Sequence, residues 1–365
     1  MPYLTFYPRL TNQAQQLNFD TLWQPELALT IPPLPINTYY NTKTAIVTHY
    51  NTPANTHLNA LSNWITQTEA LRQNDMSTLY NTFYIPKHSG GLRRIDAPKP
   101  ELMQALQKLK SILEIDLHSL THNCAHAYVK NRSTFTALRV HQANNSKWFL
   151  KLDMKNFFNS CTLTFIQTQL LKICPYNNIA PELLNTMIKT CLLNNGLPQG
   201  TPVSPLLTNL IMIPIDHAIL QYCNSHTLKY TRYADDLLIS SKYTFDVLEI
   251  TRVITNILDM QRAPFAINAE KTRYGSSSGS NWNLGLMLNK DNNITIGHKQ
   301  KQRFRATLQS FLNDLTNHNT WDTMDIQVLA GQLSYYKQTE PEYFNYVINK
   351  YSSKYNIDIN SALKA

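Results

Sequence analysis

The chain has no Cys-x-x-Cys pair, and its five cysteines are an odd number. An odd number of cysteines argues against a framework of disulfide bonds. We therefore expect reduced thiols and a cytoplasmic protein. The sequence also lacks an uninterrupted apolar run as long as a membrane span. No signal peptide is visible after Met1, and we therefore expect no membrane partner.

Acidic residues are few relative to basic ones, at 24 against 33, which gives a net charge of +9. The excess is uneven along the chain. Residues 1–75 contain three basic and four acidic residues, a balance of −1, so the remaining residues carry +10. A basic surface suits an anionic partner such as nucleic acid, although charge alone is equally compatible with a merely soluble basic protein.

At 365 residues the chain is long enough for two or three packed units. Residues 1 to about 50 are rich in Asn, Thr, Tyr and Pro and predict no regular element. The apolar spacing that follows predicts a helix from about Thr56 to Gln73. We treat residues 1–75 as an N-terminal extension, which either packs against the rest of the protein or holds an RNA or a partner subunit.

The most informative stretch is Tyr230–Ser240, where two adjacent acids interrupt an apolar strand pattern. Neighbouring side chains on a strand point to opposite faces, so Asp235 and Asp236 can converge only at a tight turn. We therefore predict a hairpin with strands at Tyr230–Tyr233 and Leu237–Ser241. Acids at a strand tip suit a hard cation such as Mg²⁺, although Asp is also a common turn residue.

Two other stretches supply a third acid and a candidate nucleotide pocket. Trp148–Phe158 is a strand-like run that reaches Asp153 and then two aromatic residues. Gly196–Pro205 is a Pro- and Gly-rich loop that opens an apolar helix. An acid at a strand end, a Pro-Gln-Gly loop and a Tyr-Ala-Asp-Asp hairpin, in this order, resemble the palm of reverse transcriptases.

Other segments make the resemblance more specific. Arg93–Leu102 resembles the fingers segment of retron-type enzymes, and His126–Ser133 resembles their His-Gly-Phe-x-x-x-Arg-Ser segment. Asn268–Thr272 is similar to the family's Asn-x-x-Lys-Thr, and Asn281–Asn289 would be its primer-gripping strand. From about residue 80 onward the chain resembles bacterial reverse transcriptases of the retron and retron-like, defence-associated family, in the group II intron lineage.

This resemblance implies an α+β right-hand polymerase fold. The fingers and palm, with an antiparallel palm sheet, would occupy residues 76–275, and the primer grip and an α-helical thumb would occupy residues 276–365. The implied activity is RNA-directed DNA synthesis by two-metal phosphoryl transfer. Asp153, Asp235 and Asp236, with the backbone carbonyl of Met154, would hold two Mg²⁺ ions, for which Mn²⁺ is a possible substitute.

The residues around these acids are expected to bind the nucleotide. The predicted hairpin at Phe83–Pro98 carries cations that suit triphosphate oxygens, unless it is an ordinary basic hairpin. Phe158 lies at the family's steric-gate position, with core packing as the alternative, and Lys271 either protonates the leaving pyrophosphate or is a surface lysine. Gly200 allows close backbone approach to the nascent base pair. The expected nucleotide-binding residues are Lys87, Arg93, Arg94, Phe158, Gln199, Gly200 and Lys271.

Two basic segments are expected to contact nucleic acid. One is the loop before the Asp153 strand, and the other is a helix from about Lys299 to Leu312, whose Phe304, Leu308 and Leu312 form one apolar stripe. A solvated basic face is the alternative for this helix, and a lone histidine is more often structural than functional. The expected nucleic-acid-binding residues are Lys130, Arg132, His141, Lys299, Lys301, Arg303 and Arg305.

The partners that the resemblance implies are a structured non-coding RNA template, a DNA primer and product, and dNTPs, with a role in antiphage defence. Residues 1–75 leave room for a homo-oligomer or a partner protein. Three alternatives remain. An RNA-directed RNA polymerase would share the acids but not the gate at Phe158. A template-independent or protein-primed DNA polymerase would share every motif. A catalytically silent RNA-binding scaffold would not need the three acids.

Overall fold

The computed structural model describes residues 15–16, 54–87, 90–173, 176–277, 282 and 285–364. Most of the N-terminal extension therefore lies outside the described residues. The same holds for the turn of the predicted fingers hairpin at residues 88–89 and for part of the primer-gripping strand expected at residues 281–289.

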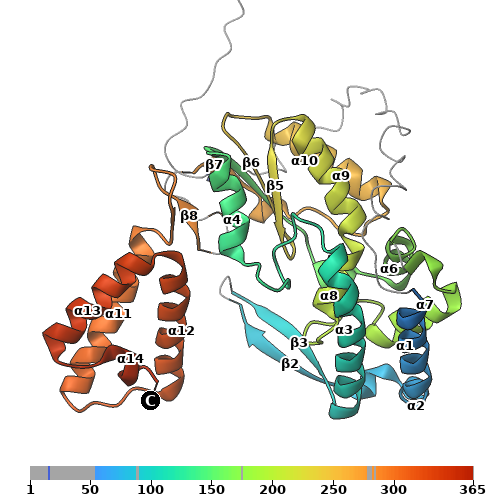
Figure 1. The fold of residues 1–365 in the computed structure, drawn as a ribbon, viewed down its shortest axis with the longest axis horizontal. Helices are drawn as coiled ribbons and strands as arrows, with labels where there is room; N and C mark the ends of the chain where they lie inside the picture. Colours follow the sequence, from blue (N-terminus) through green and yellow to red (C-terminus); the bar gives the residue numbers. More distant parts are fainter. Residues whose placement is uncertain are drawn as a thin grey trace, which may run out of the picture.

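A five-stranded antiparallel sheet lies at the centre of the palm, with strand order β1-β7-β4-β6-β5 (Figure 1). The two central strands are apolar on both faces because helices cover both. Leu150 and Ile239 pack with the helices α9 and α10, whereas Phe149 and Leu238 face the core that contains α4. The strands are β1 Gln15–Gln16, β4 Trp148–Asp153, β5 Lys229–Tyr233, β6 Asp236–Ser241 and β7 Arg273–Ser276.

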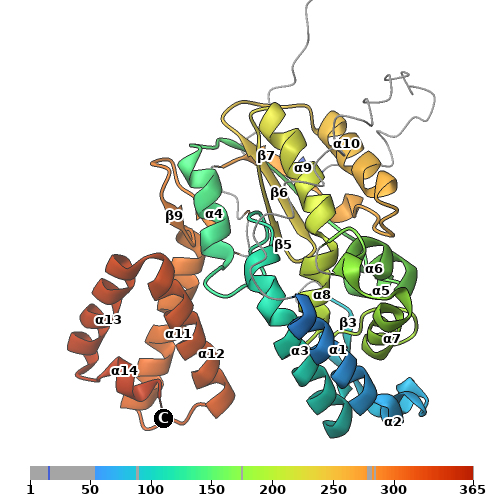
Figure 2. The same ribbon diagram turned by 45° about the vertical axis from the view of Figure 1, so that its right-hand side comes forward.

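Helices surround this sheet, and Figure 2 shows α9 and α10 on the side opposite α4. Four described cysteines are buried and free, as expected for reduced thiols. Within the described residues no single helix is long and apolar enough to cross a membrane, and α8 with α9 meets that criterion only as a pair bent by 47°. The helices are α4 Thr134–Ala143, α5 Phe157–Ser160, α6 Leu163–Leu170, α7 Pro181–Cys191, α8 Ser204–Ile211, α9 Ile213–Ser225 and α10 Val247–Met260.

The predicted fingers hairpin is present as β2 (Tyr80–Pro86) paired with β3 (Leu92–Pro98). It leads into α3 (Pro100–Leu120). The helix expected at residues 56–73 is two helices, α1 (Ala54–Gln67) and α2 (Glu69–Arg72). The break falls at Thr68, whose hydroxyl donates to the Trp64 carbonyl at 2.9 Å, the back-bonding that weakens a helix.

A helical thumb follows the palm, as expected (Figure 1). The apolar stripe predicted for its first helix is buried in the thumb core, which also contains Phe149 of the palm sheet. Trp282 stacks on Phe149 with ring centroids 5.3 Å apart, so one continuous core joins thumb and palm. The thumb elements are the hairpin strands β8 Met287–Leu288 and β9 Ile294–Thr295, and the helices α11 His298–Thr316, α12 Thr323–Thr339, α13 Pro341–Tyr355 and α14 Ile359–Ala362.

Glu340, between α12 and α13, ties the β8–β9 hairpin to the thumb. Its Oε2 accepts from the Thr295 hydroxyl at 2.9 Å and from the Ile296 N–H at 3.1 Å, and its Oε1 pairs with Lys301. Charge-assisted hydrogen bonds of this kind contribute about 1.5–3 kcal/mol each. Glu340 therefore connects the hairpin, α11 and the α12–α13 corner.

Replacing Glu340 with Ala is expected to loosen the hairpin by about 2 kcal/mol, because the Ile296 amide loses its charged acceptor. Native-state hydrogen exchange measures this directly, as roughly 30-fold faster exchange of that amide. Glu342→Ala is the matched control, since Glu342 is exposed on the next turn. Equal exchange rates in the two variants would show that Glu340 does not hold the hairpin.

Candidate active site

The strand register brings the three predicted acids together. Asp153 ends β4 and lies directly opposite Asp236, the first residue of β6. Directly opposed residues on antiparallel strands have Cβ atoms about 4.5–5.5 Å apart. Asp235 lies in the adjoining turn, and its carbonyl accepts from the Met154 N–H at 3.1 Å. The predicted hairpin is confirmed, with one correction: Asp236 belongs to the strand and not to the turn.

The turn itself is strained. It consists of Ala234 and Asp235, and Ala234 has φ +57°, a left-handed conformation in which an alanine is uncommon. Two-residue turns with a positive φ at the first position usually have glycine there. Backbone strain of this kind persists only where surrounding contacts over-determine it, and it is concentrated at functional sites.

Burial and mutual repulsion disfavour the charged forms of these acids. Burial, reinforced by Asp236 and Asp153, raises the pKa of Asp235. Burial also raises the pKa of Asp236, against the opposing effect of Lys151, whose ammonium lies 2.7 Å from Asp236. Crowded carboxylates with raised pKa values form a site whose charge a bound cation would relieve.

The donor atoms fit a hard divalent cation, because they are all oxygens. Asp153 is 5% exposed and Met154 1%, whereas Asp235 and Asp236 are half-buried, so the cluster opens to solvent on the side of the turn. The Met154 N–H points toward Asp235. In a strand the carbonyl of a residue points to the same side as its N–H, so the Met154 carbonyl also faces the side of the acids. Nearby, the buried Asn268 Oδ1 has no hydrogen-bond partner among the described residues. These residues suit a metal centre.

Lys271 is 58% exposed, and its side chain reaches the edge of the acidic cluster. Its ammonium is 2.8 Å from an Asp153 oxygen, and this hydrogen bond, with smaller effects of Asp235 and Asp236, raises the pKa of Lys271. Lys271 is therefore positioned to carry a proton at the site. Lys151 and Asn268 also contact the acids, and neither was predicted from the sequence.

The fingers cations project from the β2–β3 hairpin. Lys87, Arg93 and Arg94 are all exposed, and Arg94 pairs with Asp96 at 2.9 Å. The hairpin is attached to the palm because the Asp96 N–H donates to the Gln199 carbonyl at 2.7 Å. Arg93 lies within electrostatic range of Tyr128, which is itself close enough to Asp235 to be influenced by it.

We predicted that Gly200 allows the backbone to approach the nascent base pair, and the structure shows another reason for a glycine here. It has φ +122°, and a Cβ at this position would lie 2.9 Å from the Asp96 carbonyl oxygen. The close approach that requires glycine is therefore between the Pro-Gln-Gly loop and strand β3 of the fingers. Phe158 is half-buried against the core, packing edge-on at 5.6 Å against Phe157 while part of its ring remains open.

A buried ion pair between Arg232 and Asp216 supports the hairpin that carries Asp235 and Asp236. We did not predict this pair from the sequence. Arg232 and Asp216 are 1% and 0% exposed, and the guanidinium Nη2 lies 2.8 Å from the carboxylate. Arg232 also donates to the Ala234 carbonyl of the turn and to the Asn209 amide oxygen. The available signal was a basic residue in an apolar strand and an acid in the apolar helix α9.

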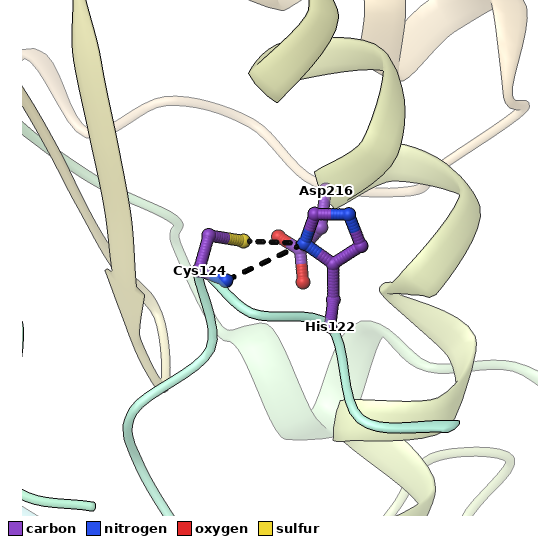
Figure 3. Close-up of side chains that lie close together, drawn as sticks. All are labelled: His122, Cys124 and Asp216. Atoms are coloured by element: carbon purple, nitrogen blue, oxygen red, sulfur yellow. Dashed lines mark hydrogen bonds between the residues drawn. The ribbon is translucent and has the colours of Figure 1, made fainter. Parts of the chain in front are cut away.

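His122 and Cys124 lie beside this ion pair (Figure 3). His122 Nδ1 is 3.1 Å from Cys124 Sγ, and with Asp216 the three side chains have potential metal-ligand atoms within 4.8 Å of one another. Both carboxylate oxygens of Asp216, however, already accept hydrogen bonds from Arg232, and Oδ1 accepts another from Tyr230. This positive charge makes the cluster a poor cation site, and we assign it to the support of the hairpin.

The prediction that His141 contacts nucleic acid is wrong, because His141 is 0% exposed. Its Nδ1 lies 2.6 Å from the Ser240 hydroxyl and its Nε2 2.8 Å from the Thr231 hydroxyl. The ring therefore connects α4 to β5 and β6. Burial lowers the pKa of His141 from 6.5 to about 3, with a smaller contribution from His126.

Folding stability should fall as the pH drops below about 6.5. The unfolded chain then protonates His141, whereas the folded protein does not until about pH 3, so stability is complete above 6.5 and is lost toward acid. Between pH 7 and 5.5 the expected loss is about 1 kcal/mol. His141→Gln should flatten this slope in chemical denaturation, and His298→Gln, at an exposed histidine, should not. If stability depended on pH equally in His141→Gln and His298→Gln, the buried His141 would not be the source of the acid sensitivity.

Two of the residues predicted to bind nucleic acid, Arg132 and Lys301, make contacts within the protein. Arg132 donates from Nη1 to the His122 and Ala125 carbonyls, both at 2.7 Å, and so closes its own loop. Lys301 pairs with Glu340 and lies 4.4 Å from the Tyr343 ring centroid. The sequence could not predict these contacts, because a basic residue near a site reveals nothing of its nearest acceptor. The remaining predicted cations are open to solvent, with Lys130, Lys299 and Arg303 exposed and Arg305 half-exposed.

The comparisons with known proteins agree with this geometry. Residues 85–320, more than half of the chain, match the family described as "Reverse transcriptase (RNA-dependent DNA polymerase)". The chain is 29% identical over 296 residues to the retron Ec83 reverse transcriptase of Escherichia coli, covering 78% of this chain and 90% of that protein. It is 28% identical over 278 residues to the retron Ec73 reverse transcriptase of the same species, covering 73% and 85%.

Among solved structures, the telomerase of Candida tropicalis in complex with a fragment of telomeric RNA is 15% identical, with a TM-score of 0.46, and the match covers 82% of this chain and 62% of that one. The predicted retron-type resemblance and the α+β right-hand polymerase fold are confirmed by the family match and the retron relatives. The family uses divalent metal ions. With its paired acids at a palm hairpin, the chain belongs to the reverse transcriptase family of RNA-directed DNA polymerases.

Proposed function

We propose that this reverse transcriptase uses two Mg²⁺ ions to copy a dedicated, structured non-coding RNA into DNA. The observation that carries the metal assignment is the register that pairs Asp153 with Asp236 beside Asp235. Three carboxylates and the Met154 carbonyl offer only hard oxygen donors. Two ions held here would act as Lewis acids on the attacking and leaving oxygens, and Mn²⁺ would be a substitute.

The protein's own residues supply the remaining steps. Lys271, whose pKa is raised by its hydrogen bond to Asp153, holds a proton near the leaving pyrophosphate. The exposed cations of the fingers hairpin bind the triphosphate of the incoming dNTP, and Arg93 has no ion-pair partner among the described residues. Phe158 closes the space that a ribose 2′-hydroxyl would occupy. Each of these assignments follows from position and charge.

Nucleic acid would bind along the basic surfaces of the thumb and the palm loop. Arg303 lines a groove between α11 and α12 together with Phe304, Gln332 and Tyr336, which combines a cation with aromatic and amide groups. Such a lining suits a nucleic-acid strand, here the RNA template and the DNA primer or product. Exposed Lys130 and Lys299 extend the basic surface beyond the groove.

The biological context rests on the relatives. The curated relatives described above are named as retron reverse transcriptases, and the chain covers 90% of the Ec83 protein and 85% of the Ec73 protein. We infer a cytoplasmic enzyme of antiphage defence. Within residues 1–75, Leu61 and Trp64 of α1 are buried in the main core, so assembly with another copy or a partner protein would use the residues that precede α1. A template-independent DNA polymerase of the same fold would use the same acids. The sequence of the DNA product distinguishes template-independent synthesis from the copying of RNA.

The test is to purify the protein from cells that contain its native locus and to sequence the RNA and DNA that copurify. One abundant RNA, with DNA complementary to part of it and absent from the Asp235→Asn variant, is the expected result. DNA without a complement in the bound RNA would point to untemplated or protein-primed synthesis. RNA bound equally by both proteins, with no DNA, would overturn the polymerase assignment in favour of an RNA-binding scaffold.

A further inference from the structure

Tyr128 has an unusual backbone conformation beside the active site. Its φ is +60°, in the left-handed region that bulky side chains rarely adopt. Its side chain is also 48% exposed, so burial of apolar surface does not explain why a tyrosine stands here. Glycine or asparagine would adopt this conformation with less strain.

The surrounding loop imposes that conformation. The Ala127 carbonyl accepts from the buried Asn209 amide at 2.8 Å, and the His126 N–H donates to the Arg232 carbonyl at 2.9 Å. On the other side, Arg132 closes the loop through the carbonyls of His122 and Ala125. The backbone is therefore held on both sides of Tyr128, as a strained residue requires.

What the strained residue contacts is Phe158. The two rings pack edge-on with centroids 6.4 Å apart and an interplanar angle of 66°. On its other side Phe158 packs edge-on at 5.6 Å against Phe157, which is 3% exposed and in turn contacts Phe265. Phe158 is thus held between one ring in the core and one exposed ring on a strained loop.

Tyr128 also lies within reach of the reacting groups. Burial raises the pKa of its hydroxyl, Asp235 and Tyr233 raise it further, and Arg93 opposes the shift, so charged groups of both the palm and the fingers act on this side chain. Because it contacts Phe158, the Tyr128 ring adjoins the position at which the incoming sugar is proposed to bind. Edge-to-face aromatic contacts restrict a neighbouring ring more than apolar contact alone does.

We propose that Tyr128 is a positioning residue for sugar selection, which holds the Phe158 ring where it excludes a ribose 2′-hydroxyl. The inference rests on the gate role proposed for Phe158. Without the Tyr128 ring, Phe158 can rotate away from Phe157 into the space that Tyr128 occupied. A ribonucleotide would then fit with less conflict, whereas a deoxyribonucleotide would lose little.

The experiment measures kcat/KM for one dNTP and the matching rNTP on an RNA template, and compares the two as a ratio. Tyr128→Asn removes the ring but tolerates the left-handed backbone, so the variant should fold as well as the parent. Its dNTP preference should fall about tenfold, and that of Phe158→Ala about 100-fold. Tyr128→Phe keeps the ring and should retain the preference. Tyr243→Asn, which removes a tyrosine 77% exposed elsewhere on the palm, is the matched control.

The double variant Tyr128→Asn/Phe158→Ala should be no less selective than Phe158→Ala alone, because both changes act through one ring. An unchanged ratio in Tyr128→Asn, with a reduced ratio in Phe158→Ala, would overturn the role of Tyr128 and leave the gate in place. An unchanged ratio in Phe158→Ala would overturn the gate and this inference together. Neither result would affect the proposed copying of RNA, which the parent protein tests separately.

Discussion

Replacing Asp235 with Asn is expected to lower RNA-templated DNA synthesis by about 1,000-fold or more. The change removes one negative charge from a partly buried cluster of oxygen ligands. Metal-assisted phosphoryl transfer depends on charge stabilisation worth several kcal/mol, and every 1.36 kcal/mol corresponds to about a factor of ten in rate. Single-turnover extension of an annealed primer measures the chemical step directly.

The same variant should be at least as stable as the parent. Burial and repulsion from Asp236 and Asp153 raise the pKa of Asp235, so its charged form is unfavourable in the folded protein without a bound cation. Removing the charge relieves that repulsion. The activity of Asp235→Asn should therefore fall while its melting temperature stays the same or rises. This trade-off is expected where a residue serves activity at a cost in stability.

Asp259→Asn, at an exposed acid on α10, is the matched control and should change neither quantity. Full DNA synthesis by Asp235→Asn would show that the hairpin acids are not the catalytic centre. A melting temperature well below that of the parent would instead attribute the lost activity to unfolding. The combination of lost synthesis and maintained stability is what distinguishes a catalytic carboxylate from a structural one.

The acids could be predicted because local patterns carry them. Two adjacent carboxylates in an apolar strand require a turn, and that argument needs only the ten residues around Asp235. The fingers hairpin and the apolar stripe of α11 are likewise local, since a Ser-Gly-Gly turn signal and a period-3.6 pattern each lie within a single segment. We predicted that the returning strand begins at Leu237, one residue too late. Asp236 belongs to β6 because it pairs with Asp153, which lies 83 positions earlier in the chain.

The partners of charged residues could not be predicted, since they depend on tertiary structure. We predicted that Arg132, His141 and Lys301 contact nucleic acid. His141 and Lys301 instead contact groups distant in sequence, and Arg132 bonds to carbonyls of its own loop. Lys151 is the converse case: its position on β4 aligns it with the acids of β6 only once the strands pair. Tyr128 is invisible to pattern analysis because its conformation depends on Asn209 and Arg232.

The buried ion pair beneath the catalytic hairpin should make the second large contribution. Arg232→Met leaves the Asp216 carboxylate fully buried, with the neutral Tyr230 hydroxyl and Cys124 thiol as neighbours and no guanidinium to compensate its charge. Breaking a buried pair by removing one partner typically costs about 3–5 kcal/mol, because the remaining charge is uncompensated. We expect a loss of that size in chemical denaturation and a melting temperature lower by roughly 5–10 °C.

Neutralising the stranded acid should restore most of the loss. In Arg232→Met/Asp216→Asn the side chain at position 216 is uncharged and its amide oxygen still accepts from Tyr230. The double variant should recover more than half of the free energy lost in Arg232→Met, although the hydrogen bond from Arg232 to the Ala234 carbonyl remains absent. Arg252→Met, at an exposed arginine on α10, is the control and should be within about 0.5 kcal/mol of the parent.

A difference between stability and activity in that double variant would locate the contribution of the guanidinium. Ala234 is strained at φ +57°, and Arg232 is the side chain that bonds its carbonyl. If refolded, stable Arg232→Met/Asp216→Asn protein still synthesises DNA poorly, the arginine positions Asp235 and Asp236 through the turn. If stability and synthesis recover together, Arg232 serves only to compensate Asp216, and the turn keeps its geometry through the β5–β6 pairing alone.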